Sequence, residues 1–343
     1  MIKYLLNFII FSFLSVKVYS QKSNMPFRLE GKIRLDSGLI ILIPLDGDGS
    51  QYYPNNSNFE AKINKGEFII TGKIPYPLAY NLFVKVNSQL IDISDVIYLD
   101  SGKQYINYDI DKLRSLQIVS NTTMKEFNDF YLPKKKDNND STLFIYSKSY
   151  PDSYISLWQL VYSLQNDGYN SIKEDIYNNL SKHLKETVTG RKIKEKLTSA
   201  KLVAIGNSFP TLHLFNSTIK ETPLNIDKNY HGKIVLIDFW FSHCTPCISQ
   251  FPELIRLYNI YHSKGFEIIG ISVDDKPLIN DWKNVIENYK LPWKHYLDLK
   301  AFEAHKLSID SYPSDFLLDQ QGKIIAKKID LKALEIYLKE CFQ

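Results

Sequence analysis

Two of the three cysteines in this 343-residue chain, Cys244 and Cys247, stand three positions apart between a strand pattern and a helix pattern. Residues 233–238 read Lys-Ile-Val-Leu-Ile-Asp, an apolar run of the kind that is buried in a parallel sheet. After the pair, apolar residues recur from 248 to 261 at the spacing of one buried helix face. The pattern predicts a strand, a turn and a helix that begins at the cysteine pair. A further apolar run over 266–273 completes a strand–helix–strand crossover.

This placement suits thiol chemistry. The thiolate is the form of cysteine that attacks disulfides, so a reactive cysteine needs a lowered pKa. A helix N-terminus offers unpaired N–H groups and a partial positive charge that stabilise an anion. Cys244 stands at that end, and Cys247 lies one turn further on, close enough to close a ring and release a bound partner. We therefore expect a redox-active disulfide between the two.

Other uses of a cysteine pair are less well supported. A structural zinc site usually has four ligands, and no second pair of cysteines or histidines stands at ligand spacing. Haem attachment requires His directly after the second cysteine, where Ile248 stands. A static disulfide at the strand–helix corner is the remaining alternative. No metal or cofactor is expected.

Composition narrows the class of protein further. Lys and Arg number 42 against 38 Asp and Glu, a net charge of +4 that is too balanced for a nucleic-acid binder. Hydrophobic residues at 44% and charged residues at 23% are typical of a globular protein. Three cysteines are too few for a scaffold of several disulfides.

The chain divides into four predicted segments. Residues 1–20 carry Lys3, a short apolar run and small residues, which is typical of a secretory signal peptide; an uncleaved anchor is the alternative, because Lys17 lies in the cleavage region. Residues 21–115 alternate as strands of a β-rich, sandwich-like or barrel-like domain. Residues 116–203 have the spacing of a helical connector, and 204–343 form the α/β redox domain. We expect a periplasmic or cell-envelope protein with no transmembrane segment after signal removal.

Residues 204–343, about two-fifths of the chain, resemble the thioredoxin-fold domain of the TlpA/ResA-like thiol–disulfide oxidoreductases. The motifs that carry the resemblance are Ile237-Asp238-Phe239-Trp240, Cys244-Thr245-Pro246-Cys247, Pro252, and Tyr312-Pro313 followed by an apolar strand. Two positions depart from the family pattern, since His243 replaces a common Trp and Gln250 replaces a common Glu. The resemblance implies a thioredoxin fold over this region.

The resemblance also implies roles for individual residues. Cys244 is expected to be the nucleophile and Cys247 the resolving thiol of a Cys244–Cys247 redox disulfide. Asp238 has two roles open, acceptor of the Cys247 proton or hydrogen-bonded structural residue. Pro313 is expected to be cis and to expose backbone beside the sulfurs, where a substrate strand could pair. Substrate contacts are expected at Trp240, His243, Thr245, Pro246 and Tyr312.

Three of the remaining residues have alternatives. Trp240 suits core packing as well as substrate contact. His243 either stabilises the neighbouring thiolate when protonated or is an exposed spacer. Cys341, near the chain's end, is expected to be a buried or half-buried residue that takes no part in the exchange, and pairing with another molecule is its alternative.

The expected function is disulfide exchange with protein substrates by an exported enzyme, in the reducing direction. Relatives mostly draw electrons from a membrane thiol carrier, which is the implied partner. The motif does not fix the direction, because thioredoxin-fold potentials span roughly −270 to −120 mV. Two alternatives stay open. One is an envelope binding protein with an accessory or vestigial redox domain; the other is a peroxidase of the same fold, although Phe241 stands where that chemistry wants Thr.

Overall fold

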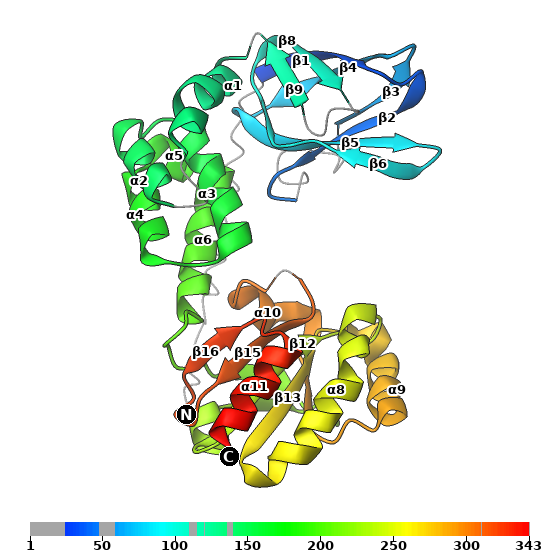
Figure 1. The fold of residues 1–343 in the computed structure, drawn as a ribbon, viewed down its shortest axis with the longest axis vertical. Helices are drawn as coiled ribbons and strands as arrows, with labels where there is room; N and C mark the ends of the chain where they lie inside the picture. Colours follow the sequence, from blue (N-terminus) through cyan, green and yellow to red (C-terminus); the bar gives the residue numbers. More distant parts are fainter. Residues whose placement is uncertain are drawn as a thin grey trace, which may run out of the picture. The chain divides into compact units, whose positions relative to one another are not determined.

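The computed structural model describes residues 25–47, 59–109, 115–119, 121–135, 140–309 and 311–342. The predicted signal peptide, residues 1–20, lies outside the described residues. The chain forms two compact units, Met1–Lys134 and Lys135–Gln343, each of which is described by itself (Figure 1).

The first unit is built on one curled nine-stranded sheet (Figure 1). Its strands are β1 (Met25–Ile33), β2 (Ser37–Pro44), β3 (Phe59–Asn64), β4 (Glu67–Ile74), β5 (Leu78–Val86), β6 (Gln89–Ile93), β7 (Ile97–Leu99), β8 (Gly102–Asp109) and β9 (Ser115–Val119). The order is β6-β5-β2-β3-β4-β1-β8-β9, and β7 pairs with β5. The predicted β-rich domain is confirmed, and it takes the form of a single sheet rather than two separate sheets.

Side chains along the strands of this sheet alternate between the buried core and more exposed positions. In β1 the buried positions are Phe27, Leu29, Gly31 and Ile33, and the residues between them are more exposed. Gly31 lies opposite Phe68 on β4, and a Cβ at Gly31 would lie 2.0 Å from the Phe68 ring. The glycine therefore provides the space that this aromatic ring occupies.

Short helices end the first unit and begin the second. Asn121 caps α1 (Thr122–Glu126) by accepting from Met124 N–H, and η2 (Phe127–Tyr131) and η3 (Leu132–Lys134) follow. Strand β9 crosses the predicted boundary at 115/116. The helices of the second unit are α2 (Asp140–Ser149), α3 (Tyr154–Asp167), α4 (Ser171–Asn179), α5 (Lys182–Glu186) and α6 (Val188–Leu202). Helices thus follow the β-rich domain, as the sequence predicts.

The rest of the second unit is a seven-stranded sheet with helices on both faces. Its strands are β10 (Leu212–Phe215), β11 (Glu221–Leu224), β12 (Ile234–Trp240), β13 (Phe266–Ser272), β14 (Lys294–Leu297), β15 (Ser314–Leu318) and β16 (Ile324–Lys327), in the order β11-β10-β14-β13-β12-β15-β16. Strands β12, β13 and β14 are parallel, and β15 is antiparallel to β12. The α/β architecture predicted for 204–343 is confirmed.

The helices of this region are α7 (Ile226–Tyr230), α8 (Thr245–Tyr261), η4 (His262–Lys264), η5 (Lys276–Leu278), α9 (Ile279–Tyr289), η6 (Leu299–Ala301), α10 (Phe302–Lys306) and α11 (Leu331–Cys341). Pro246 lies in the first turn of α8, where its missing N–H costs no hydrogen bond, and Pro252 lies within the helix. Among the described residues, no helix combines the length and apolarity needed to cross a membrane.

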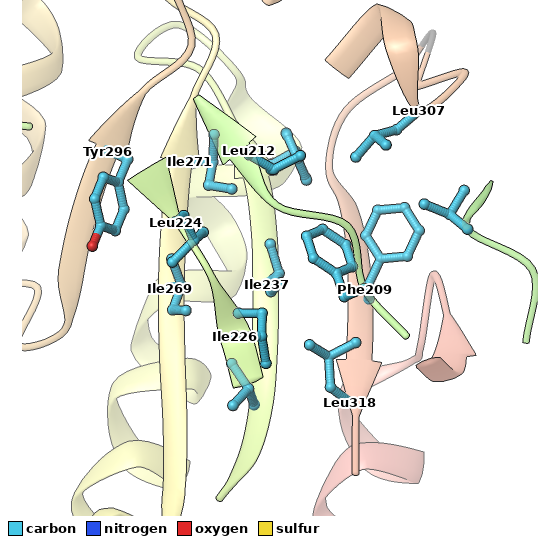
Figure 2. Packing of buried hydrophobic residues seen from close by; sticks show 14 of the residues in the cluster. Phe209, Leu212, Leu224, Ile226, Ile237, Ile269, Ile271, Tyr296, Leu307 and Leu318 are labelled. Carbon is cyan, nitrogen blue, oxygen red and sulfur yellow. The ribbon is translucent and has the colours of Figure 1, made fainter. Parts of the chain in front are cut away.

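Two apolar clusters fill the two faces of the sheet. On one face, Ile237 and Ile269 pack with Leu212, Leu224 and residues near α7 and α10 (Figure 2). On the other face, Leu236 and Trp240 pack with α8, α9 and α11, and this cluster includes both Cys244 and Cys247. Every residue of β12 and β13 is buried, as expected for central parallel strands. The cysteine pair therefore lies over a fixed, buried part of the sheet.

Candidate functional site

The cysteine pair forms a disulfide at the start of α8. The sulfurs of Cys244 and Cys247 are bonded at 1.98 Å, and their Cα atoms are 5.3 Å apart. Cys244 is the N-cap of the helix, and its Sγ accepts a hydrogen bond from Cys247 N–H at 3.2 Å. The predicted position of Cys244 at the helix N-terminus is confirmed. An anionic Cys244 sulfur at this point would face the unpaired N–H groups of the first turn.

Both cysteines are buried, whereas the residues beside Cys244 are exposed to solvent. Cys244 is 3% exposed and Cys247 is 1% exposed. His243, Thr245 and Pro246 are exposed beside them. A partner that reaches the Cys244 sulfur must therefore contact this exposed rim first.

A buried carboxylate anchors the loop that leads into the pair. Asp274, 2% exposed, accepts hydrogen bonds from Ser242 N–H at 2.9 Å and from Ser242 Oγ–H at 2.7 Å. It also accepts from Ser272 Oγ–H at 2.6 Å, at the end of β13. Hydrogen bonds to an ionised acceptor are stronger than neutral ones. The residue two positions before Cys244 is thus held at the carboxyl end of the neighbouring strand.

His243 contacts a carboxyl group of α9 across the rim. Its Nε2 lies 2.9 Å from Asp281 Oδ2 on α9, and the two side chains are 62% and 44% exposed. The ring next to Cys244 is therefore positioned by a carboxylate that the sequence did not single out.

Asp238 lies on the sheet face that α8 covers. Asp238 is 4% exposed. On β12 it lies two residues before Trp240, which belongs to the apolar cluster that includes both cysteines. Burial, and then the charge of Asp315, raise the pKa of Asp238 to about 7. Burial also raises the pKa of Asp315 to about 6, against the opposing effects of Ile329 N–H and Lys328. Asp238 can therefore take up or release a proton near neutral pH.

The segment 312–314 lies beside the loop that precedes the cysteines. The Tyr312–Pro313 peptide bond is cis, which confirms that prediction. The Tyr312 ring contacts the Phe241 ring edge-on, with centroids 5.8 Å apart. Ser314 pairs with Phe239 across β15 and β12, so Pro313 lies one step further toward the cysteines. Tyr312 and Pro313 are both half-buried.

Trp240 is part of the core. It is 0% exposed, and its ring packs edge-on against Phe251 of α8 with centroids 5.2 Å apart. The expected substrate contact at Trp240 is not met in this structure, because the ring has no exposed surface. Core packing, the alternative role, fits the geometry.

A glycine and a histidine complete the buried layer. Gly270 pairs with Asp238 on one side and with His295 on the other. A Cβ at Gly270 would lie 2.8 Å from His295 Nδ1 and 3.2 Å from Trp240 Nε1. Burial lowers the pKa of His295 to about 4, so the ring is neutral at physiological pH.

Sequence reasoning missed four residues of this layer and rim: Asp274, Asp281, Asp315 and His295. Two of them left a signal. Asp274 directly follows the strand after the cysteine helix, and polar residues at the carboxyl ends of parallel strands gather at one edge of the sheet. Asp315 is a lone charge in an apolar strand. Asp281 and His295 carry no such signal in the sequence, because only the folded chain brings them close to the site. Within the described residues, no group of three or more His, Cys, Asp or Glu could hold a metal ion.

Known proteins resemble this region. Residues 204–332 match the Redoxin family. The thiol–disulfide oxidoreductase ResA of Geobacillus thermodenitrificans is 31% identical over 132 residues, which cover 38% of this chain and 72% of that protein. The chain belongs to the ResA-like family of thiol–disulfide oxidoreductases.

Other family members match over similar lengths. The ResA protein of Bacillus cereus strain ZK is 32% identical over 102 residues, which are 30% of this chain and 58% of that relative's length. Among solved structures, the thioredoxin domain of a thiol–disulfide oxidoreductase from Bacteroides vulgatus is 31% identical, with 41% of this chain and 99% of that chain covered and a TM-score of 0.36. The ResA-like part of the chain is its C-terminal region, where the disulfide lies.

Proposed function

We propose that this chain is an exported thiol–disulfide oxidoreductase that reduces disulfides of protein substrates through Cys244 and Cys247. The observation that carries the proposal is the disulfide at the N-terminus of α8, with Cys244 as the N-cap residue. The ResA-like relatives support the reaction class. The sequence pattern of residues 1–20 supports export.

The reaction proceeds in two exchanges. The Cys244 thiolate attacks one sulfur of the substrate disulfide, forms a mixed disulfide and releases the other sulfur as a thiolate. Cys247 then loses its proton to Asp238 and attacks the Cys244 sulfur. The bond between Cys244 and the substrate breaks, and the substrate leaves as a second thiolate. Two electrons pass to the substrate, and Cys244 and Cys247 are left oxidised.

The rim determines how a substrate approaches. Exposed Thr245 and Pro246 flank the sulfur, and Tyr312 and Pro313 lie on the neighbouring segment. Pro313 has no N–H to donate within the sheet, and we propose that an extended substrate chain passes along the segment before β15. His243 adds an exposed ring that is tied to Asp281. We propose that these residues contact the substrate and that Trp240 supports them from below.

Regeneration requires an electron donor. A membrane thiol carrier of the cell envelope would reduce the Cys244–Cys247 disulfide by the same exchange in reverse. Measuring the equilibrium with defined dithiothreitol mixtures gives the reduction potential. A potential near the reducing end of the thioredoxin-fold range, roughly −270 mV, supports reductase function, and one near −120 mV contradicts it.

The activity test uses insulin disulfide reduction with dithiothreitol. Wild-type protein should accelerate the reaction, and Cys244→Ser should abolish the acceleration. Cys341→Ser is the matched control, since Cys341 is the free cysteine of the described chain and lies outside the site. Cys341 is exposed, so the expectation that it is buried or half-buried is wrong. Equal rates for wild type and Cys244→Ser would exclude the proposed enzyme activity and favour a binding function.

The substrates can be trapped in cells. A Cys247→Ala variant cannot resolve the mixed disulfide, so substrate proteins should remain bound to Cys244. Mass spectrometry of material that is released only by reductant identifies them. Finding none in the native host would count against protein substrates. The same cells test export, because N-terminal sequencing of the mature protein from an envelope fraction should begin after residue 20.

A further inference from the structure

A row of paired residues crosses the sheet beneath the cysteine pair. Asp238 on β12 is directly opposite Asp315 on β15, and Gly270 on β13 is next to Asp238 on the other side. Directly opposite residues on antiparallel strands point to the same face, with Cβ atoms about 4.5–5.5 Å apart. That face is the one covered by α8, because Trp240 and Leu317, two residues along each strand, pack with Cys244 and Cys247. The two carboxyl groups therefore lie on the same face of the sheet, where Asp238 is buried and Asp315 is half-buried.

Asp315 is held in place. Its Oδ1 accepts a hydrogen bond from Ile329 N–H at 2.9 Å. Its backbone carbonyl accepts from Lys328 N–H at 3.0 Å, which joins the strand to the segment after β16. These two hydrogen bonds tether Asp315 to the segment after β16.

Two carboxylates at directly opposite positions of adjacent strands repel each other. The second ionisation is costly, because the burial of Asp238 limits the water that can screen the like charges. Protons then leave the pair in two coupled steps rather than independently. The raised pKa values of both Asp238 and Asp315 agree with this arrangement.

The other groups around the pair are few among the described residues. On β14, His295 lies beyond Gly270 and stays neutral near pH 7. Beyond β16, Lys328 is exposed, and its charge favours ionised Asp315. On α8, Cys244 and Cys247 are joined in the oxidised protein. Asp315 is therefore the nearest identified charge that can disfavour ionisation of Asp238.

We propose that Asp315 is a positioning residue of the exchange reaction, whose carboxylate raises the proton affinity of Asp238 and thereby sets the pH at which Cys247 is deprotonated. This inference rests on the proposed function, in which Asp238 accepts the Cys247 proton. During resolution the proton moves from the Cys247 sulfur to Asp238, and the Cys247–Cys244 bond forms as the Cys244–substrate bond breaks. Asp315 exchanges no electrons and keeps its hydrogen bond to Ile329 throughout.

The direct test is a carboxyl titration that needs no activity. Full-length oxidised protein carrying 13C-labelled aspartate is titrated by NMR, with the Asp238 signal assigned through Asp238→Asn. In Asp315→Asn, which retains an oxygen acceptor for Ile329 N–H, the Asp238 midpoint should fall by about one pH unit, a tenfold loss of proton affinity. Lys328→Gln keeps both carboxyls and removes the nearby cation. It should raise the Asp315 midpoint instead.

The second test is the pH dependence of the reaction. The rate at which reduced protein is oxidised by insulin should show an acid limb that moves to lower pH in Asp315→Asn by about the same amount as the titration midpoint. In an Asp238→Asn background, Asp315→Asn should move the limb no further. If Asp315→Asn acted only by disturbing the structure, the rate would fall at every pH and the acid limb would stay at the same pH.

The possible failures are distinguishable. An unchanged Asp238 midpoint in Asp315→Asn overturns the inference, whatever the enzyme activity. If the Asp238 midpoint shifts but the acid limb of the rate does not, the part of the inference in which Asp315 sets the pH of Cys247 deprotonation is overturned. Failure of the proposed function would show instead as wild-type protein that does not reduce insulin, and the titration would still report on the carboxyl pair.

Discussion

His243 Nε2 lies 2.9 Å from Asp281 Oδ2, so the ring that directly precedes Cys244 is tied to α9 rather than pointing freely into solvent. The carboxylate offsets part of the charge that a protonated ring would offer to the Cys244 thiolate. Both side chains are substantially exposed, and exposed charges interact weakly through water. The electrostatic contribution of His243 should therefore be present but small.

Replacing His243 by Ala tests this contribution. If the His243 ring stabilises the thiolate when protonated, its loss should raise the pH midpoint of Cys244 alkylation, by less than about one pH unit. The measurement uses reduced protein in a Cys341→Ser background, with mass spectrometry to follow Cys244 alone. His231→Ala is the control, because this exposed histidine lies before the start of β12, at the other end of that strand. An unchanged midpoint in His243→Ala would make His243 a spacer.

Asp274 should matter for both stability and reactivity. Asp274→Ala leaves the Ser242 N–H and the Ser242 and Ser272 hydroxyls without their buried acceptor. We expect a loss of about 3 kcal/mol in unfolding free energy, because buried donors without partners are costly. The loop before Cys244 should also loosen, which slows insulin reduction. Denaturant unfolding and the insulin assay measure the two effects.

The neighbouring Asp275 provides the matched control for Asp274. It is exposed, and its side chain makes no capping hydrogen bond to the helix that follows. Asp275→Ala should change the unfolding free energy by less than about 0.5 kcal/mol. Equal losses in the two variants would show that the hydrogen bonds of Asp274 do not anchor the loop.

Periodicity predicts most of the redox domain. The apolar run at 233–238, the helical spacing after Cys247 and the next apolar run predict β12, α8 and β13 in order. This order of elements by itself predicts that Cys244 lies at the N-terminus of the helix. The cis peptide bond at Pro313 was predicted from the family resemblance, and it is present.

Contacts across strands were not predictable in the same way. Asp315 meets Asp238 only because β15 pairs with β12 in one register, and register is not visible in a single strand's pattern. Asp281 reaches His243 across 38 positions of sequence. The burial of Cys244 also depends on packing by segments far along the chain. Sequence thus located the reactive pair but not the charges that surround it.

Gly270 should resist substitution because His295 occupies its space. In Gly270→Ala, the new Cβ would lie 2.8 Å from His295 Nδ1, so the ring or the strand must move. We expect a loss of about 2 kcal/mol in unfolding free energy, as for other overpacked cores. A double-mutant cycle with His295→Ala provides the control, since removing the ring should lower the cost of Ala at 270. If the losses of unfolding free energy in the two variants are additive, the strain does not come from contact between the new Cβ and His295.

Asp238 should make the oxidised protein less stable as pH rises. Its pKa is raised from 3.8 to about 7 in the folded state, so folded protein holds a proton that unfolded protein has lost. The associated stability is complete below about pH 4 and is lost as pH rises to about 7, at about 1.4 kcal/mol for each pH unit. Between pH 5 and pH 8, Asp238 should therefore cost roughly 3 kcal/mol. Asp315 adds a loss of the same sign that ends near pH 6.

Asp238→Asn should remove that dependence. The amide does not ionise, so the variant should be more stable than wild type at pH 8 and should differ much less at pH 5. Guanidinium unfolding followed by tryptophan fluorescence measures the difference, because Trp240, Trp282 and Trp293 all lie in the redox domain. Glu287→Gln on α9, an exposed carboxyl, should leave the pH dependence unchanged. If Asp238→Asn loses as much stability as wild type between pH 5 and pH 8, Asp238 is ionised throughout that range and is too weak a base to accept the Cys247 proton efficiently.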